Sequence, residues 1–345
     1  MSQDLNSAAN QFFSRREAMR PTARTWAKHI GLLLVTFCTV TIAGLLPPFG
    51  IKYDIFSGLN PQTWTETLYA LLSLPAAYVQ ELFQVVGLLF TSSEYRAYGL
   101  SFSFSLLFIL TSHEMGHYVA CRLYGVDATL PFFIPTPPLV GPAGTFGAFI
   151  KIVSPLPSRR ATFDIGVAGP IAGFVALIPI AVIGFLTLQP APPVPNVEGG
   201  QIVFSNPLFF HLLSAVFGAG SELRQHSPNP FYAAAWLGML VTSLNLIPSG
   251  QLDGGHAVYS VFGERLHRWT GRIAFAAMIV LSISGLYFYN SPSGILFAVL
   301  LGVMMRIRHP EPLDTTPLDA PRRFVAILTL LIFVLSFTPF PIQIQ

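Results

Sequence analysis

Long stretches without a charged residue constrain this chain more than any other feature of its sequence. A helix needs about 20 apolar residues to cross the hydrocarbon core of a bilayer. Five windows contain no aspartate, glutamate, lysine or arginine, and a sixth contains a single acid, Glu114. The uncharged windows are residues 29–51, 165–197, 225–252, 273–305 and 324–345, and the window with the acid is 97–121. The sequence therefore predicts a polytopic, all-α membrane protein.

The overall composition excludes a soluble fold. Charged residues make up 10% of the chain and apolar residues 52%, whereas about a quarter of the residues in a soluble domain are charged. So few charges could not cover the surface of a soluble protein of this length. The net charge of +3 gives no reason to expect nucleic acid as a partner. Cys38 and Cys121 lie far apart in apolar stretches, so we expect neither a disulfide framework nor a cysteine metal cluster.

The apolar window 273–305 is interrupted by the sequence NSPSG at residues 290–294, which predicts two helices joined by a tight turn. The stretch 66–92 is harder to assign. It is apolar overall, but Pro75 interrupts it, and Gln80 and Glu81 lie in its second half.

The basic residues help to decide the topology, because lysine and arginine collect in cytoplasmic loops. Four basic segments can lie on one side only if residues 66–92 do not cross the membrane fully. We therefore expect about seven transmembrane helices, with 66–92 re-entrant or lying on the outer face, and eight helices if this segment crosses. The four segments carry Arg15 to Lys28, Arg122 to Arg160, Arg265 to Arg272, and Arg306 to Arg323.

The N-terminal segment, residues 1–28, is polar and basic, and it lacks the apolar core and cleavage site of a signal peptide. We expect it to be a cytoplasmic tail of an integral, multi-pass protein in the bacterial cell (inner) membrane. Residues 29–97 then form the N-terminal membrane segments and an outer loop, residues 98–260 the membrane core, and residues 261–345 the C-terminal transmembrane helices.

The loop between the windows 97–121 and 165–197 is unusually apolar and rich in proline and glycine. Residues 129–152 read TLPFFIPTPPLVGPAGTFGAFIKI. Non-helical backbone at membrane depth is stable only when it is buried in protein or lines a wet cavity. Residues 145–152 have strand-like content and follow a turn at Gly141-Pro142. The sequence predicts a small membrane-associated β-hairpin here.

The most specific motif is HEMGH at residues 113–117, inside the window that carries a single acid. On a helix, positions i and i+4 share one face, so His113 and His117 can bind one Zn²⁺. Glu114 lies beside the first ligand, where it can accept a proton from water. Two histidines and a glutamate are unfavourable within a spanning helix unless a metal and a wet cavity receive them.

A hydrolytic zinc site usually has three protein ligands, so a third ligand should come from another apolar segment. The window 225–252 leads into the sequence NLIPSGQLDGGH, residues 245–256, in which Asp253 directly follows the uncharged run. The flanking glycines allow the backbone to turn so that a short carboxylate can reach a metal. An isolated aspartate before Gly-Gly is usually a turn residue. Together with HEMGH, it is the best candidate for the third ligand.

The motifs HEMGH and NLIPSGQLDGG together resemble the site-2 protease family of intramembrane zinc metalloproteases, of the M50 type. The segment DIGVAGPIAG, residues 164–173, is similar to the Gly-Pro helix of that family, and GTFGAFIKI is similar to its membrane-associated hairpin. The resemblance covers roughly residues 98–260. It points to a branch without a PDZ domain, because residues 189–230 are too few to hold one.

The resemblance implies one Zn²⁺ held by His113, His117 and Asp253, with Glu114 as the residue that activates water. It also implies that Asn245 lies near the scissile carbonyl as an oxyanion donor, although an amide that only packs between helices is an equal alternative. The expected activity is hydrolysis of a peptide bond in or near a transmembrane segment of a substrate protein within the lipid bilayer. The hairpin is expected to bind the unfolded substrate as an added strand.

Three weaker candidates lie close to these motifs. His256 either donates a hydrogen bond to a metal ligand or packs as a polar side chain, and we favour packing. Asp164 is interpreted as a carboxylate that complements the dipole of its helix. Gly166, Gly169 and Gly173 are interpreted as small residues that permit close helix contact.

Three other functions remain open from the sequence, and one of them is a zinc-dependent membrane enzyme of other chemistry. A membrane transporter or channel would also explain polar residues and broken helices at membrane depth. It gives no reason for HEMGH, and the two halves of the sequence show no internal repeat. A catalytically silent relative that binds membrane segments is the third alternative, although the acid, both histidines and the aspartate are all present.

Overall fold

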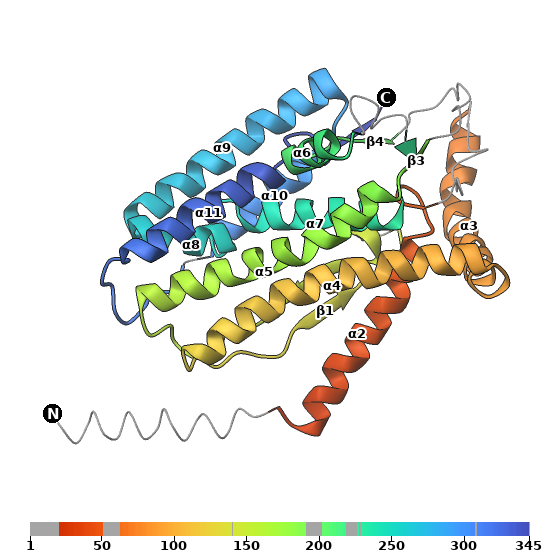
Figure 1. Cartoon of the computed structure of the whole chain (residues 1–345). Helices are drawn as coiled ribbons and strands as arrows, with labels where there is room; N and C mark the ends of the chain where they lie inside the picture. The colour runs from red at the N-terminus through yellow and green to blue at the C-terminus, as the bar shows by residue number, and fades with distance from the viewer. Residues whose placement is uncertain are drawn as a thin grey trace.

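The architecture was analysed in a computed structural model, which describes residues 21–50, 63–139, 141–190, 202–218, 226–227, 229–307 and 309–344. The axes of helices α4, α5, α7, α9 and α11 are roughly aligned, and these helices form a bundle (Figure 1). Within it, α5 packs against α4, α7 and α8, and α9 packs against α8 and α10. Most of the predicted N-terminal tail falls outside the described residues.

The helices of the described part agree with the all-α prediction, although several begin earlier than the apolar windows. Thr22 caps α2 and Ser158 caps α5, each by accepting a hydrogen bond from the backbone three residues later. Basic residues next to these caps are therefore helical. The helices are α2 (Ala23–Ala43), α3 (Trp64–Thr91), α4 (Ser93–Leu123), α5 (Arg159–Leu186), α6 (Leu208–Val216), α7 (Pro230–Asn245), α8 (Asp253–Phe262), α9 (Glu264–Tyr289), α10 (Ser293–Met304) and α11 (Ala320–Ser336).

Four of these helices, α2, α3, α5 and α9, are long and apolar enough to cross a membrane by length and composition. The expected number of seven or eight spans is not confirmed in the described part of the chain. Helices α7, α10 and α11 have only 16, 12 and 17 residues, and α4 carries the polar HEMGH residues. The predicted break after α9 is confirmed, since Asn290 adopts a left-handed conformation between α9 and α10.

Pro75 was expected to interrupt this segment, but α3 continues through the proline and is 28 residues long. Figure 1 shows α3 at the end of the bundle where α4 begins, running at a steep angle to α4 and α5. It is therefore not aligned with the helices that form the bundle.

The predicted hairpin is present. Strand β1 (Phe132–Pro135) pairs antiparallel with β2 (Thr145–Phe149), and a short 3-10 turn, η1 (Pro142–Gly144), lies between them. Helix α2 supports this hairpin at both ends. The Nδ1 atom of His29 lies 2.8 Å from the carbonyl oxygen of Pro131, and the hydroxyl of Thr39 donates to the carbonyl of Gly144 at 2.8 Å. Strand β1 therefore faces α2, while β2 lies on the side of α4.

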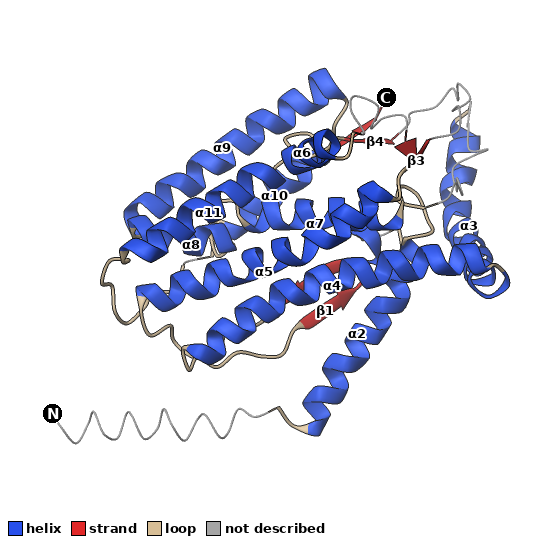
Figure 2. Ribbon diagram, in the orientation of Figure 1, coloured by secondary structure: helices blue, strands red, loops and turns tan. Residues whose placement is uncertain are grey.

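Two smaller sheets involve residues that the sequence did not suggest as strands (Figure 2). Strand β3 (Gln189–Pro190) pairs with β5 (His226–Ser227), and β4 (Ile202–Phe204) pairs with β6 (Ile342–Ile344). The second sheet brings the end of the chain back beside the segment that precedes α6.

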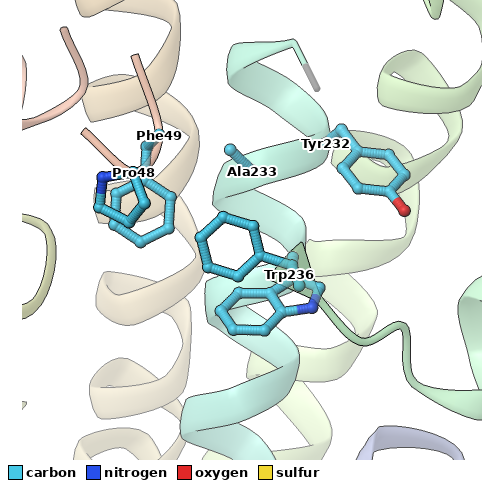
Figure 3. Close-up of a pocket in the computed structure, with 6 residues that line it drawn as sticks. Pro48, Phe49, Tyr232, Ala233 and Trp236 are labelled. Carbon is cyan, nitrogen blue, oxygen red and sulfur yellow. The ribbon is translucent and has the colours of Figure 1, made fainter. Parts of the chain in front are cut away.

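An apolar pocket lies beside the first residues of α7, and Figure 3 shows that the hydroxyl of Tyr232 points away from Phe49. This hydroxyl donates to Asn206 at 2.7 Å. The pocket contains none of the predicted metal ligands, which lie towards the other end of α7, so it is not the site predicted from the motifs. It is lined by Pro48, Phe49, Phe204, Tyr232, Ala233 and Trp236.

Candidate metal centre

Helix α4 carries both histidines of the HEMGH motif on one buried face. His113, Glu114 and His117 are 4%, 6% and 7% exposed. One turn of helix separates the two imidazoles, and their Nε2 atoms lie 3.1 Å apart. The face predicted from the i, i+4 spacing is therefore directed into the protein.

Asp253 reaches the same point from a different part of the chain. Helix α7 ends at Asn245, and Asp253 is the first residue of α8. The second residue of α8 must be glycine for α8 to approach the end of α7 this closely, because a Cβ atom on Gly254 would lie 2.0 Å from the carbonyl oxygen of Leu246. The Oδ2 atom of Asp253 lies 3.2 Å from Nε2 of His113 and 3.3 Å from Nε2 of His117.

These three donor atoms form a nearly equilateral triangle. Ligand atoms about 2.0–2.1 Å from one tetrahedral zinc ion are separated by about 3.3 Å, so the observed 3.1–3.3 Å edges fit such an ion. In the part of the chain that the structure describes, this is the one group of three metal-binding side chains whose donor atoms all lie within 4.8 Å of one another. Nitrogen and carboxylate oxygen donors are also the types that zinc accepts.

A hydrogen bond outside the triangle prepares His117 for this role. Its Nδ1 atom lies 2.7 Å from the carbonyl oxygen of Ile165 in α5. A carbonyl can only accept, so Nδ1 carries the proton and Nε2 presents its lone pair to the triangle. The tautomer that a metal requires is thus fixed by the backbone of the neighbouring helix.

Glu114 lies next to the triangle without belonging to it. Its carboxylate accepts a backbone hydrogen bond from Ile150, the residue directly after β2. This contact places the acid between the metal-binding face of α4 and the end of the hairpin. Such a position suits a group that handles a proton more than a group that binds the metal.

Asn245 is also drawn into the site. Asn245 is the last residue of α7, and its Nδ2 atom lies 3.4 Å from Nε2 of His113. All five residues predicted for the site (His113, Glu114, His117, Asn245 and Asp253) are therefore brought together by α4, α7 and α8.

The sequence analysis interpreted the glycines of α5 only as aids to helix contact, and the structure places them against the site itself. A Cβ atom on Gly169 would lie 2.1 Å from Nε2 of His117, and one on Gly173 would lie 3.2 Å from Nδ1 of His113. A larger side chain at position 169 would displace the ring of His117, and one at position 173 would press on His113. Their spacing of four residues, equal to that of the two histidines, is the signal that could have identified them.

The interpretation of Asp164 as a helix-dipole partner is wrong. Helix α5 begins at Arg159, so Asp164 lies beyond its first turn. Its carboxylate instead forms an ion pair with Arg322 of α11, with a closest N–O distance of 2.7 Å, and accepts a hydrogen bond from Tyr124. This cluster joins the ends of three helices near the site.

His256 does not donate to a metal ligand through its Nδ1 atom, which lies 2.7 Å from Nε2 of His309. His309 follows α10 and was assigned no role from the sequence. The two histidines are 53 residues apart, and no local pattern connects them.

Comparison with protein families finds that residues 101–285 match the model for peptidase family M50, a stretch that contains all three donors and Glu114. This chain belongs to peptidase family M50. The resemblance to site-2 proteases is thereby confirmed, and the match spans more than half of the chain.

The chain is also similar to named plant proteins. The chain is 30% identical to the probable zinc metalloprotease EGY1, chloroplastic, of Arabidopsis thaliana over 70% of its own length and 43% of the relative's. For the EGY1 protein of Oryza sativa subsp. japonica the identity is also 30%, over 70% of this chain and 40% of the relative. The chain thus spans less than half the length of these relatives.

The geometry predicts that the purified M50 chain holds one zinc ion. His117→Ala and Asp253→Ala should each weaken zinc binding by more than about tenfold, because even outer hydrogen-bond partners of a metal site contribute that much. The zinc content of the detergent-solubilised proteins, measured by elemental analysis after dialysis, tests this. His211→Ala, which changes an exposed histidine of α6, is the matched control. Full zinc occupancy in both donor variants would contradict the assignment.

Proposed function

We propose that this chain is an intramembrane zinc endopeptidase that hydrolyses a peptide bond in or near a transmembrane segment of membrane-protein substrates. The observation that carries the proposal is the buried triangle of His113, His117 and Asp253, with Glu114 beside it on the same helix. The names of the plant relatives as probable zinc metalloproteases support the same conclusion.

The chemistry follows from the positions of the side chains. His113, His117 and Asp253 would hold the zinc ion, which would supply a Lewis acid for the substrate carbonyl and lower the pKa of the attacking water. Glu114 takes the proton from the attacking water and passes it to the nitrogen of the breaking peptide bond, which leaves as an amine. The side-chain amide of Asn245, next to His113, is placed to donate a hydrogen bond to the oxygen that gains negative charge.

The hairpin supplies a binding edge for the substrate. In the described residues β2 pairs only with β1, and Ile150, the residue directly after β2, contacts Glu114. A helical substrate hides its carbonyl groups, so it must unwind before hydrolysis. We infer that the unwound segment adds to β2 as a further strand, which presents its backbone beside Glu114.

The topology is part of the proposal. Helices of 16 and 17 residues, such as α7 and α11, are about 25 Å long and approach the thickness of the bilayer core. We propose about seven spans with the N-terminus in the cytoplasm. The steep angle of α3 to α4 and α5 (Figure 1) supports its place on the outer face.

Single cysteines at Thr63 and Ser92, at the two ends of α3, should then be labelled from the same side of the membrane. Labelling from opposite sides would show an eighth span.

The membrane environment follows from the apolar helices and the family. The expectation of a bacterial inner membrane stays a prediction, because the plant relatives are named as chloroplastic proteins.

Glu114→Gln is predicted to abolish proteolysis while zinc remains bound, because the substitution removes the proton acceptor but none of the three donors. Loss of a general base slows a reaction by about 10²- to 10⁴-fold. The measurement is cleavage of a single-span model substrate by the purified protein in proteoliposomes. Glu94→Gln, the same change at an exposed position of α4, should leave the rate unchanged.

Equal rates for the wild type and Glu114→Gln would exclude the proposed role of Glu114. A wild-type protein that binds zinc and the substrate but cuts no tested segment would instead favour a silent relative.

Substrate pairing with β2 is tested by disulfide crosslinking in the Glu114→Gln protein, after replacement of Cys38 and Cys121 by alanine. A cysteine at Phe146 of β2, which is 63% exposed, should crosslink to a cysteine near the cleaved bond. The control is a cysteine at Phe90 of α3, which is 80% exposed. Similar yields at both positions would argue against binding along the hairpin.

A further inference from the structure

A third glycine of helix α5 packs against a third histidine, as two other glycines of α5 pack against the two donor histidines. Gly166, Gly169 and Gly173 lie on one face of this helix. A Cβ atom on Gly169 or Gly173 would contact the ring of His117 or His113, and a Cβ atom on Gly166 would lie 2.7 Å from Cβ of His256. The contact between Gly166 and His256 therefore limits how closely α8 approaches α5, one turn after Asp253.

His256 is hydrogen-bonded to His309, and the partners of His309 define the tautomers. The Nδ1 atom of His309 lies 2.8 Å from the carbonyl oxygen of Pro310, so it carries a proton. Burial lowers the pKa of His256 to about 4 and of His309 to about 3, so both rings are neutral at pH 7. Nε2 of His309 is then the acceptor, and Nδ1 of His256 donates to it at 2.7 Å.

A second contact fixes the ring of His309 on α8. The ring stacks on Tyr259, with centroids 4.1 Å apart and an angle of 11° between the planes. His256 and Tyr259 are three residues apart and share one face of α8. His309 thus contacts this helix at two adjacent positions.

The segment that carries His309 is itself attached to the start of α5. The backbone N–H of Leu313 donates to Leu156 at 3.1 Å, and the N–H of Arg159 donates to the carbonyl of Asp314 at 2.8 Å. Further along, Leu318 is buried against Phe163 and Val167 of α5. The linker between α10 and α11 therefore connects α8 to the helix that seats the donor histidines.

We propose that His309 is a positioning residue for the metal ligand Asp253. Asp253 is the first residue of α8, and Leu252 before it provides no side-chain cap. The direction of the carboxylate therefore depends on where α8 lies. By holding His256 and Tyr259, His309 keeps the carboxylate oxygen 3.2–3.3 Å from the two imidazole nitrogens. This inference rests on the proposed zinc site.

The test compares wild type, His309→Ala, His309→Gln and the exposed control His211→Ala as full-length purified proteins. Two measurements are made: the rate at which a chelator removes zinc, and the visible absorption spectrum after replacement of zinc by Co²⁺, which reports ligand geometry. His309→Ala should bind zinc about two- to tenfold more weakly, as expected for the loss of one hydrogen bond that holds α8 in place, and should change the cobalt spectrum. The amide of His309→Gln can still accept from His256, so it should recover most of both properties.

Wild-type zinc retention and an unchanged cobalt spectrum in His309→Ala would overturn the inference, as would equal zinc loss in His211→Ala. If His309→Ala does not fold, Tyr259→Leu provides the test. Removing the stacked ring should speed zinc release about two- to tenfold, and an unchanged rate would overturn the inference. A wild-type protein without stoichiometric zinc would contradict the proposed function itself, whereas zinc in the wild type with no effect at position 309 would contradict only the role of His309.

Discussion

Three lone-pair donors converge in the interior of this protein, and the rest of the structure is arranged to permit it. Two imidazole nitrogens and a carboxylate oxygen lie 3.1–3.3 Å apart on side chains that are largely removed from water. Such a group is unfavourable in a low-dielectric environment unless a cation binds it. The glycines of α5 make room for the rings, and the backbone of Ile165 fixes one tautomer. The glycine turn before α8 brings in the carboxylate.

The sequence predicted which side chains converge better than it predicted the boundaries of the helices. The spacing of the two histidines in HEMGH predicts that they share one face of a helix. Asp253 directly follows an apolar run that must end in a turn. The sequence therefore predicts that all three side chains lie at the same depth in the membrane. The caps Thr22 and Ser158 begin helices before the apolar windows do, which window composition alone does not detect. Pro75 lies within a continuous helix of 28 residues although a proline removes one backbone hydrogen bond, so this proline does not mark the end of a helix.

Contacts between distant segments that carry no recognisable motif could not be predicted. Asp164 was interpreted from its neighbours in sequence, but its partner Arg322 lies 158 residues away. His256 and His309 meet only because the linker after α10 returns to the start of α5. The family match ends at residue 285, so both Arg322 and His309 lie outside it. Residues beyond the family region therefore contact the region that carries the three candidate metal ligands.

The central claim is that His113, His117 and Asp253 bind one zinc ion. X-ray absorption at the zinc edge, measured on the wild type and on Asp253→Cys, tests it most directly. We expect only nitrogen and oxygen neighbours at about 2.0–2.1 Å in the wild type, and a sulfur neighbour at about 2.3 Å in the cysteine variant. A sulfur neighbour in the wild type, or a zinc environment that Asp253→Cys leaves unchanged, would contradict it.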